Sequence, residues 1–186
     1  MGAYRLRDLL LPPSLVSALR LPLAVAFPFA GGEPAAGIAL LVAAGTTDVI
    51  DGWLARRFGW VTATGGVVDG VTDKLFAGTV VGSLLVWGHL APADAALLAT
   101  REMLELPLVL WLAASPRARR AREKSSMANL PGKAATVLQF AAVAAALALP
   151  GAKEPLLFAT SATGAWAALR YWRRAMAEHA AEREHT

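Results

Sequence analysis

Six long apolar runs dominate the sequence and limit what it can fold into. They occupy residues 14–30, 36–55, 66–89, 93–114, 132–149 and 155–172. Each approaches the ~20 residues that a helix needs to cross the hydrocarbon core of a bilayer. The chain is 56% hydrophobic and only 17% charged, which is too apolar for a soluble domain of this length. We therefore predict an all-α integral membrane protein, built as a six-transmembrane-helix bundle.

Short polar segments flank the predicted bundle. In residues 1–12, leucines and a tyrosine are set against Arg5, Arg7 and Asp8, which predicts a short N-terminal interfacial helix. The six-helix transmembrane domain would then span residues 13–174. The polar residues 175–186 would form a cytoplasmic C-terminal tail.

The basic residues predict how the bundle is oriented. One side of the predicted membrane carries Arg5, Arg7, Arg56, Arg57, the Arg117–Lys124 cluster, Lys133, Arg170, Arg173 and Arg174. The loops on the other side carry a single basic residue, Lys153. By the positive-inside rule, both termini face the cytoplasm, in a multi-pass protein of the inner membrane. The net charge of +4 fits anionic membrane lipid rather than nucleic acid, which we do not expect as a partner.

Four aspartates lie on the second and third predicted spans. Asp48 and Asp51 are spaced i, i+3, and Asp69 and Asp73 are spaced i, i+4, so each pair shares one face of its helix. The connection between the spans is short, which predicts antiparallel neighbouring helices. All four carboxylates would then meet about two helical turns inside the cytoplasmic boundary.

Four carboxylates in apolar surroundings need a compensating cation, because buried charge and like-charge repulsion are both costly. Oxygen ligands without His or Cys favour Mg²⁺ or Mn²⁺, and four acids can hold two such ions. One alternative is simple pairing with Arg56, Arg57 and Lys74. Another is a divalent-cation transporter, although its acids would spread through the depth of the bundle rather than cluster at the cytoplasmic ends of two helices.

Small and basic residues border the aspartates. Gly52 and Ala55 leave room for a flat or phosphorylated group to approach the helix, and Arg56 at the boundary can bind phosphate through two hydrogen bonds. Gly65 and Gly66 open the third span, where free backbone N–H groups could assist.

Together these residues form the pattern D-x-x-D-G-x-x-A-R-x8-G-x-x-x-D-x-x-x-D from Asp48 to Asp73. The pattern, at all eight fixed positions, resembles the signature of the CDP-alcohol phosphatidyltransferases. The six-span layout is similar to that family too. The resemblance implies an enzyme that transfers a phosphatidyl group from CDP-diacylglycerol to an acceptor hydroxyl and releases CMP, with residues 13–174 as the catalytic domain.

The resemblance also implies roles for individual residues. The metals would be bound by Asp48, Asp51, Asp69 and Asp73. The CDP moiety would be contacted by Asp48, Gly52, Ala55, Arg56 and Asp69. Asp73 would be the general base on the acceptor hydroxyl, a role that the spacing alone does not assign among the four acids.

The acceptor is predicted from weaker matches. Asp73-Lys74 and Arg101-Glu102 are similar to bacterial enzymes that use glycerol 3-phosphate, which makes this the leading acceptor. Residues 129–136 match the related S-x-x-G-K-x-K-T stretch only in part, with Asn129 in place of Ser and Ala135 in place of the second Lys. Inositol phosphate, phosphatidylglycerol and serine therefore stay alternatives.

Three basic residues are candidate acceptor ligands: Arg20, Arg101 and Lys133. For Arg101 the alternative is a buried structural ion pair with Glu102 or Glu105, and for Lys133 it is a membrane anchor. The spacings Gly66-xxx-Gly70 and Gly78-xxx-Gly82 predict close helix packing, either within the bundle or at the seam of a homodimer.

Overall fold

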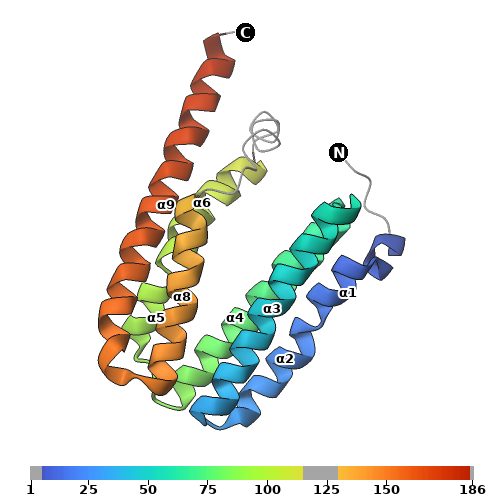
Figure 1. The fold of residues 1–186 in the computed structure, drawn as a ribbon. Helices are drawn as coiled ribbons and strands as arrows, with labels where there is room; N and C mark the ends of the chain where they lie inside the picture. Colours follow the sequence, from blue (N-terminus) through green and yellow to red (C-terminus); the bar gives the residue numbers. More distant parts are fainter. Residues whose placement is uncertain (1–5, 115–129, 185–186) are drawn as a thin grey trace. The chain divides into compact units, whose positions relative to one another are not determined.

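A computed structural model describes residues 6–114 and 130–184, and this part of the chain is helical throughout, without a strand (Figure 1). The helices are η1 (Leu6–Leu10), α1 (Pro12–Ala18), α2 (Arg20–Ala26), η2 (Phe27–Ala30), α3 (Pro34–Phe58), α4 (Ala63–Val86), α5 (Pro92–Leu98), α6 (Thr100–Ala114), α8 (Leu130–Ala148) and α9 (Pro150–Glu184). They form two compact units, residues 1–91 with 146–148, and residues 92–145 with 149–186.

Local sequence explains the helix ends that matter for the site. α1 ends at Ala18, and Pro22 has no N–H to donate to the carbonyl of that residue, four positions back. α3 ends at Phe58, and the next residue, Gly59, takes a left-handed φ of 68° that glycine adopts without a Cβ penalty. α4 begins after Thr62, whose hydroxyl oxygen accepts a hydrogen bond of 3.0 Å from Gly65 N, a regular N-cap.

In the first unit, α1 and α2 each pack against both α3 and α4. α3 and α4 run in opposite directions (Figure 1), as expected. They are not, however, among the helix pairs whose backbones are in close contact. Side chains of the two helices nevertheless meet at Asp48, Asp51 and Asp69, while α1 and α2 pack more closely against each of them.

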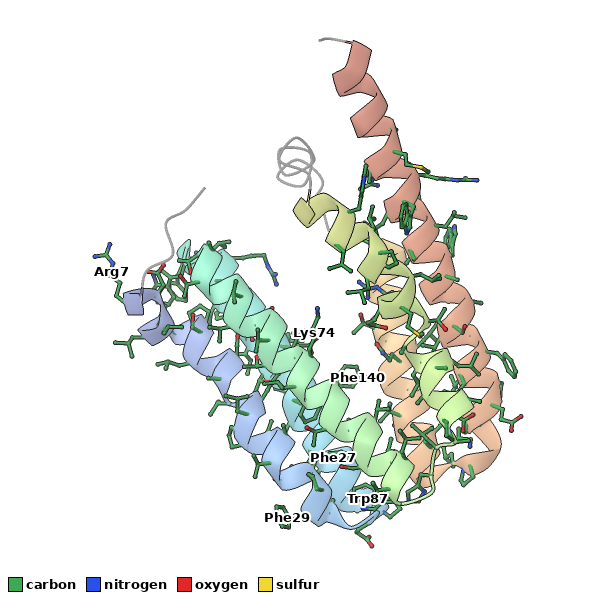
Figure 2. All side chains as sticks on the ribbon, turned by 180° about the vertical axis from the view of Figure 1, so that it is seen from behind. Arg7, Phe27, Phe29, Lys74, Trp87 and Phe140 are labelled. Atoms are coloured by element: carbon green, nitrogen blue, oxygen red, sulfur yellow. The ribbon has the colours of Figure 1, made fainter. Side chains whose placement is uncertain are left out.

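The core of this unit continues to the end opposite η1. Phe27 is fully buried. Its ring meets Phe76 edge-on at a centroid distance of 6.2 Å and stacks on Trp87 at 5.6 Å. Figure 2 shows Phe27 and Trp87 together at this end of the unit, where Phe29 extends outward. The last turn of α8 also packs here, since a Cβ added to Gly37 would lie 2.9 Å from a methyl of Leu147.

In the second unit, α9 packs against α5 and α6. The Thr100 and Ser161 hydroxyls are 2.9 Å apart, and Lys153 forms an ion pair with Asp94 at 2.9 Å. A Cβ on Gly164 would lie 3.0 Å from Cβ of Arg101, so the absence of a side chain at Gly164 allows α6 and α9 to approach closely.

Two of the described segments are long and apolar enough to cross a membrane, Pro12–Ala30 and Pro34–Phe58, and a shorter apolar helix covers Ala134–Ala148. α4 has 24 residues but carries Asp69, Asp73 and Lys74. The all-α prediction is confirmed for the described residues, while the count of six spans stays a prediction.

Candidate active site

α3 and α4 bring three of the four predicted aspartates together in the first unit. One carboxylate oxygen from each of Asp48, Asp51 and Asp69 lies within 4.8 Å of the others. We call these residues the three-aspartate group. The Asp51 side chain is 7% exposed, whereas those of Asp48 and Asp69 are 59% and 46% exposed. The group therefore has a buried side at Asp51 and an open side at the other two carboxylates.

Asp73 lies one turn further along α4 and is exposed. It is near enough to Asp48, Asp69 and Arg20 to interact with them electrostatically, but it is not a member of the three-aspartate group. Within residues 6–114 and 130–184, the Asp73 carboxylate forms no hydrogen bond or ion pair. It is therefore the acid of the four that has no bonding partner in the described chain.

Arg20, the first residue of α2, compensates the three-aspartate group. Its Nη1 donates to Asp69 Oδ1 at 2.6 Å, and its Nη2 donates to Asp48 Oδ1 at 2.8 Å and to Asp51 Oδ2 at 2.9 Å. The Ser17 hydroxyl donates to Asp51 Oδ2 at 2.7 Å. The Arg20 side chain is 1% exposed, so these ion pairs lie on the buried side of the group.

The pairing of Arg20 with these aspartates was not predicted from the sequence. The predicted partners of the aspartates were Arg56, Arg57 and Lys74, and Arg20 was predicted to bind the acceptor. The sequence did contain an indication of this pairing. An arginine inside an apolar run usually pairs with an acid, and Ser17, three residues before Arg20, lies on the same side of a helix. In the described chain the three-aspartate group makes its ion pairs with Arg20 alone.

The donor set fits a hard divalent cation. One guanidinium cannot balance four carboxylates, so net negative charge remains. Arg20 uses one oxygen from each member of the three-aspartate group, which leaves the second oxygen of each, together with the free carboxylate of Asp73. Oxygen donors of this kind are those that Mg²⁺ and Mn²⁺ prefer.

Gly52 and Arg56 continue the face of α3 that carries Asp48, since the three residues are spaced four apart. A Cβ added to Gly52 would lie 3.2 Å from Nη1 and 3.4 Å from Nη2 of Arg56. The Arg56 guanidinium therefore folds back along the helix over Gly52. Ala55 is half-buried, and its carbonyl accepts the N–H of Trp60 at 3.0 Å, which fastens the turn after α3.

The expectation of free N–H groups at Gly65 and Gly66 is wrong. Gly65 N donates to the Thr62 hydroxyl, and Gly66 N donates to the Thr62 carbonyl at 3.1 Å. Gly65 instead makes room for α1, because a Cβ there would lie 3.3 Å from the Ser14 hydroxyl oxygen.

The other candidate acceptor ligands belong to the second unit. Arg101 Nε donates to Glu105 Oε1 at 3.0 Å and its Nη1 donates to Thr136 Oγ1 at 3.3 Å, so the ion pair with Glu105 considered as an alternative is present. Lys133 lies in α8, but its side chain is outside the described residues. The Arg117–Lys124 cluster and Asn129 are also outside them.

Curated relatives match parts of the chain. A CDP-diacylglycerol–glycerol-3-phosphate 3-phosphatidyltransferase of Rickettsia bellii is 36% identical over 77 residues, 41% of this chain and 42% of the relative. The Rickettsia felis protein of the same name gives the same figures. A cardiolipin synthase (CMP-forming) of Streptomyces coelicolor is 37% identical over 110 residues, 57% of this chain and 47% of the relative. The chain thus covers less than half the length of each of these relatives. No solved structure matches it significantly.

A match to a whole family extends over most of the sequence. The sequence profile described as CDP-alcohol phosphatidyltransferase matches residues 10–170. This range contains the three-aspartate group, Asp73, Gly52, Arg56 and Arg20. The chain belongs to the CDP-alcohol phosphatidyltransferase family.

Proposed function

We propose that this chain transfers a phosphatidyl group from CDP-diacylglycerol to the hydroxyl of an acceptor alcohol and releases CMP. The observation that carries the proposal is the three-aspartate group, in which carboxylate oxygens from α3 and α4 lie within 4.8 Å of one another. These aspartates belong to the motif that the chain shares with its family.

We assign the residues as follows. The three-aspartate group and Asp73 hold the divalent cations, of which we propose two. When bound, the metal neutralises the diphosphate and stabilises the negative charge of the leaving CMP. Arg56 binds a phosphate oxygen across Gly52, on the face that leads to Asp48. Ala55 borders the nucleotide on the next turn.

Asp73 takes the proton of the acceptor hydroxyl, because its carboxylate has no bonding partner in the described residues and is exposed. The acceptor oxygen then forms a bond to the β-phosphorus of CDP-diacylglycerol. The bond between this phosphorus and the bridging oxygen breaks, and CMP leaves with the electron pair. Holding the reacting groups in line contributes to the rate together with the general base.

We propose glycerol 3-phosphate as the acceptor. The pairs Asp73-Lys74 and Arg101-Glu102, and the printed names of the Rickettsia relatives, support it. Arg101 and Lys133 are proposed as ligands of its phosphate. Phosphatidylglycerol is the second candidate acceptor. The longer match is to the Streptomyces coelicolor protein, which is named a cardiolipin synthase. In addition, Ala135 stands where the related motif has a lysine.

We further propose a six-span inner-membrane protein with its site and termini in the cytoplasm, acting as a homodimer. Large apolar side chains on α3 and α4 are exposed, among them Val42, Val49, Val67 and Leu75, as expected for surfaces that meet lipid. A Cβ added to Gly66, Gly70, Gly78 or Gly82 meets no described atom within 4 Å. This leaves the glycine face of α4 accessible to a partner.

The activity is tested by CMP release from CDP-diacylglycerol, with acceptors supplied one at a time. We expect CMP with glycerol 3-phosphate when Mg²⁺ or Mn²⁺ is present. Removal of the metal by a chelator should abolish release, and addition of Mg²⁺ should restore it, because the diphosphate charge is then neutralised again. CMP formation only with phosphatidylglycerol would assign the second acceptor. Folded protein that released no CMP with any acceptor and metal would refute the enzyme.

Gly52→Ala tests whether the space over Gly52 serves the nucleotide. The new methyl would approach the Arg56 guanidinium to about 3.2 Å, which displaces the guanidinium from its place along α3. We expect the KM for CDP-diacylglycerol to rise several-fold with a smaller change in kcat. Gly151→Ala is the matched control, because its methyl meets nothing within 4 Å. Equal KM values for both variants would remove Gly52 and Arg56 from the nucleotide site.

A further inference from the structure

We propose that Arg20 is a positioning residue, which holds the three-aspartate group in the arrangement that binds a divalent cation and does not itself bind the acceptor. This inference rests on the proposed metal-dependent transfer, and it revises the role that the sequence suggested for Arg20. It follows from how the guanidinium is bonded, where it is buried and which helices it joins.

The two terminal nitrogens of Arg20 serve different helices. Nη2 bonds both acids of α3, at 2.8 and 2.9 Å, and Nη1 bonds the acid of α4, at 2.6 Å. The backbones of α3 and α4 approach each other less closely than each approaches α1. A planar guanidinium with fixed donor directions therefore helps to set the separation between the carboxylates of the two helices.

The burial of Arg20 argues against contact with a soluble acceptor. Its side chain is 1% exposed, whereas Asp48 is 59% and Asp69 is 46% exposed. Arg20 thus lies behind the carboxylates as seen from the open side. Both hydrogens of Nη2 are already engaged by the acids of α3. A molecule entering from the open side meets the aspartates before it meets Arg20.

The same bonds orient the oxygens. Arg20 takes one oxygen of each member of the three-aspartate group, so the second oxygen of each is left for a cation. At Asp51 the Ser17 hydroxyl binds the same Oδ2 that Arg20 binds, and Oδ1 is left. Hydrogen bonds that orient the ligands of a metal commonly raise its affinity.

Charge alone predicts the opposite effect, because a guanidinium near the ligands repels a cation. Arg20→Lys separates the two effects. Lysine keeps the positive charge and hence the repulsion, but a single ammonium nitrogen cannot bond both helices in the way that the two guanidinium nitrogens do. A loss of cation affinity in this variant therefore reports the loss of orientation.

The experiment is a Mn²⁺ titration of purified protein without lipid substrate, with free Mn²⁺ followed by electron paramagnetic resonance. For Arg20→Lys we expect Mn²⁺ to bind roughly 10- to 100-fold more weakly than to the wild type. Ser17→Ala should weaken binding several-fold, because it releases only Asp51. The matched control is Arg170→Lys, a change at an exposed arginine over the Trp166 ring, which should leave Mn²⁺ affinity unchanged.

Thermal unfolding without metal distinguishes a role of Arg20 in orienting the aspartates from a role in stabilising the fold alone. A structural role would lower the melting temperature of Arg20→Lys while the folded protein kept its Mn²⁺ affinity, and that result would overturn the inference. An unchanged Mn²⁺ affinity with a raised KM for glycerol 3-phosphate would also overturn it, in favour of acceptor binding. If Arg20→Lys does not fold, Ser17→Ala decides, and unchanged affinity there refutes the proposal. Wild-type protein that bound no Mn²⁺ would instead contradict the proposed metal site.

Discussion

At saturating Mg²⁺, Asp73→Asn should lower kcat roughly 10²- to 10⁴-fold, the contribution typical of a general base, and leave the KM for CDP-diacylglycerol nearly unchanged. The asparagine amide has similar size but cannot take a proton from the acceptor hydroxyl. Because Asp73 has no hydrogen bond or ion pair in the described residues, the substitution breaks neither kind of bond, and the melting temperature should stay near that of the wild type.

Steady-state CMP release measures kcat and KM for this variant, and thermal unfolding measures its stability. Asp73→Glu, which keeps a carboxylate on a longer side chain, should recover part of the lost rate. Normal turnover by Asp73→Asn would assign the base to another acid. A large rise in KM at constant kcat would make Asp73 a ligand for ground-state binding instead.

Asp51→Asn should have the second large effect, on metal affinity and on stability together. Asp51 is the buried member of the three-aspartate group and accepts bonds from Ser17 and Arg20. Loss of its charge weakens cation binding and removes one ion-pair partner of a buried guanidinium. Breaking a buried pair costs about 3–5 kcal/mol, and the loss here should be smaller because Arg20 keeps two other carboxylates.

We therefore expect CMP release by Asp51→Asn to fall roughly 10- to 100-fold at fixed Mg²⁺, as is typical when the support of a metal site is lost, and to recover in part at high Mn²⁺. The matched control is Asp94→Asn in the second unit, which also removes the acid of a partly buried ion pair. This control should lower the melting temperature with little change in the metal dependence of the rate. The same metal dependence in both variants would show that Asp51 acts only on stability.

The positions of the helices could largely be predicted from apolar runs. The runs 36–55 and 66–89 correspond to α3 and α4 within a few residues. The run 93–114 was predicted as one helix, but the structure has α5 and α6 separated at Ala99. The interruption is slight, because the backbone bonds from Ala99 N to the Ala95 carbonyl and from Met103 N to the Ala99 carbonyl, both 2.9 Å, continue across it. The predicted run 155–172 is the middle of α9, which extends in both directions.

The candidate site was predictable where it depends on spacing along one helix. Asp48 and Asp51 had to share a face of α3, and the short loop after Phe58 had to return α4 beside them. The partner of Arg20 was not predictable in this way, because it depends on the rotation and depth of α2 relative to α3 and α4. The lack of a hydrogen bond or ion pair at Asp73 in the described residues was not predictable either, because it depends on which neighbouring side chains lie within bonding distance.

The position of α2 along its own axis is fixed at both ends. Arg20 at its first residue is tied to Asp69, and Phe27, directly after its last residue, lies against Phe76. Both partners belong to α4. A helix attached at two such distant points cannot slide past its neighbour without breaking one attachment. Substitutions of Phe27 or Phe76, at the end of α2 opposite Arg20, can therefore alter the three-aspartate group by shifting α2 along its axis.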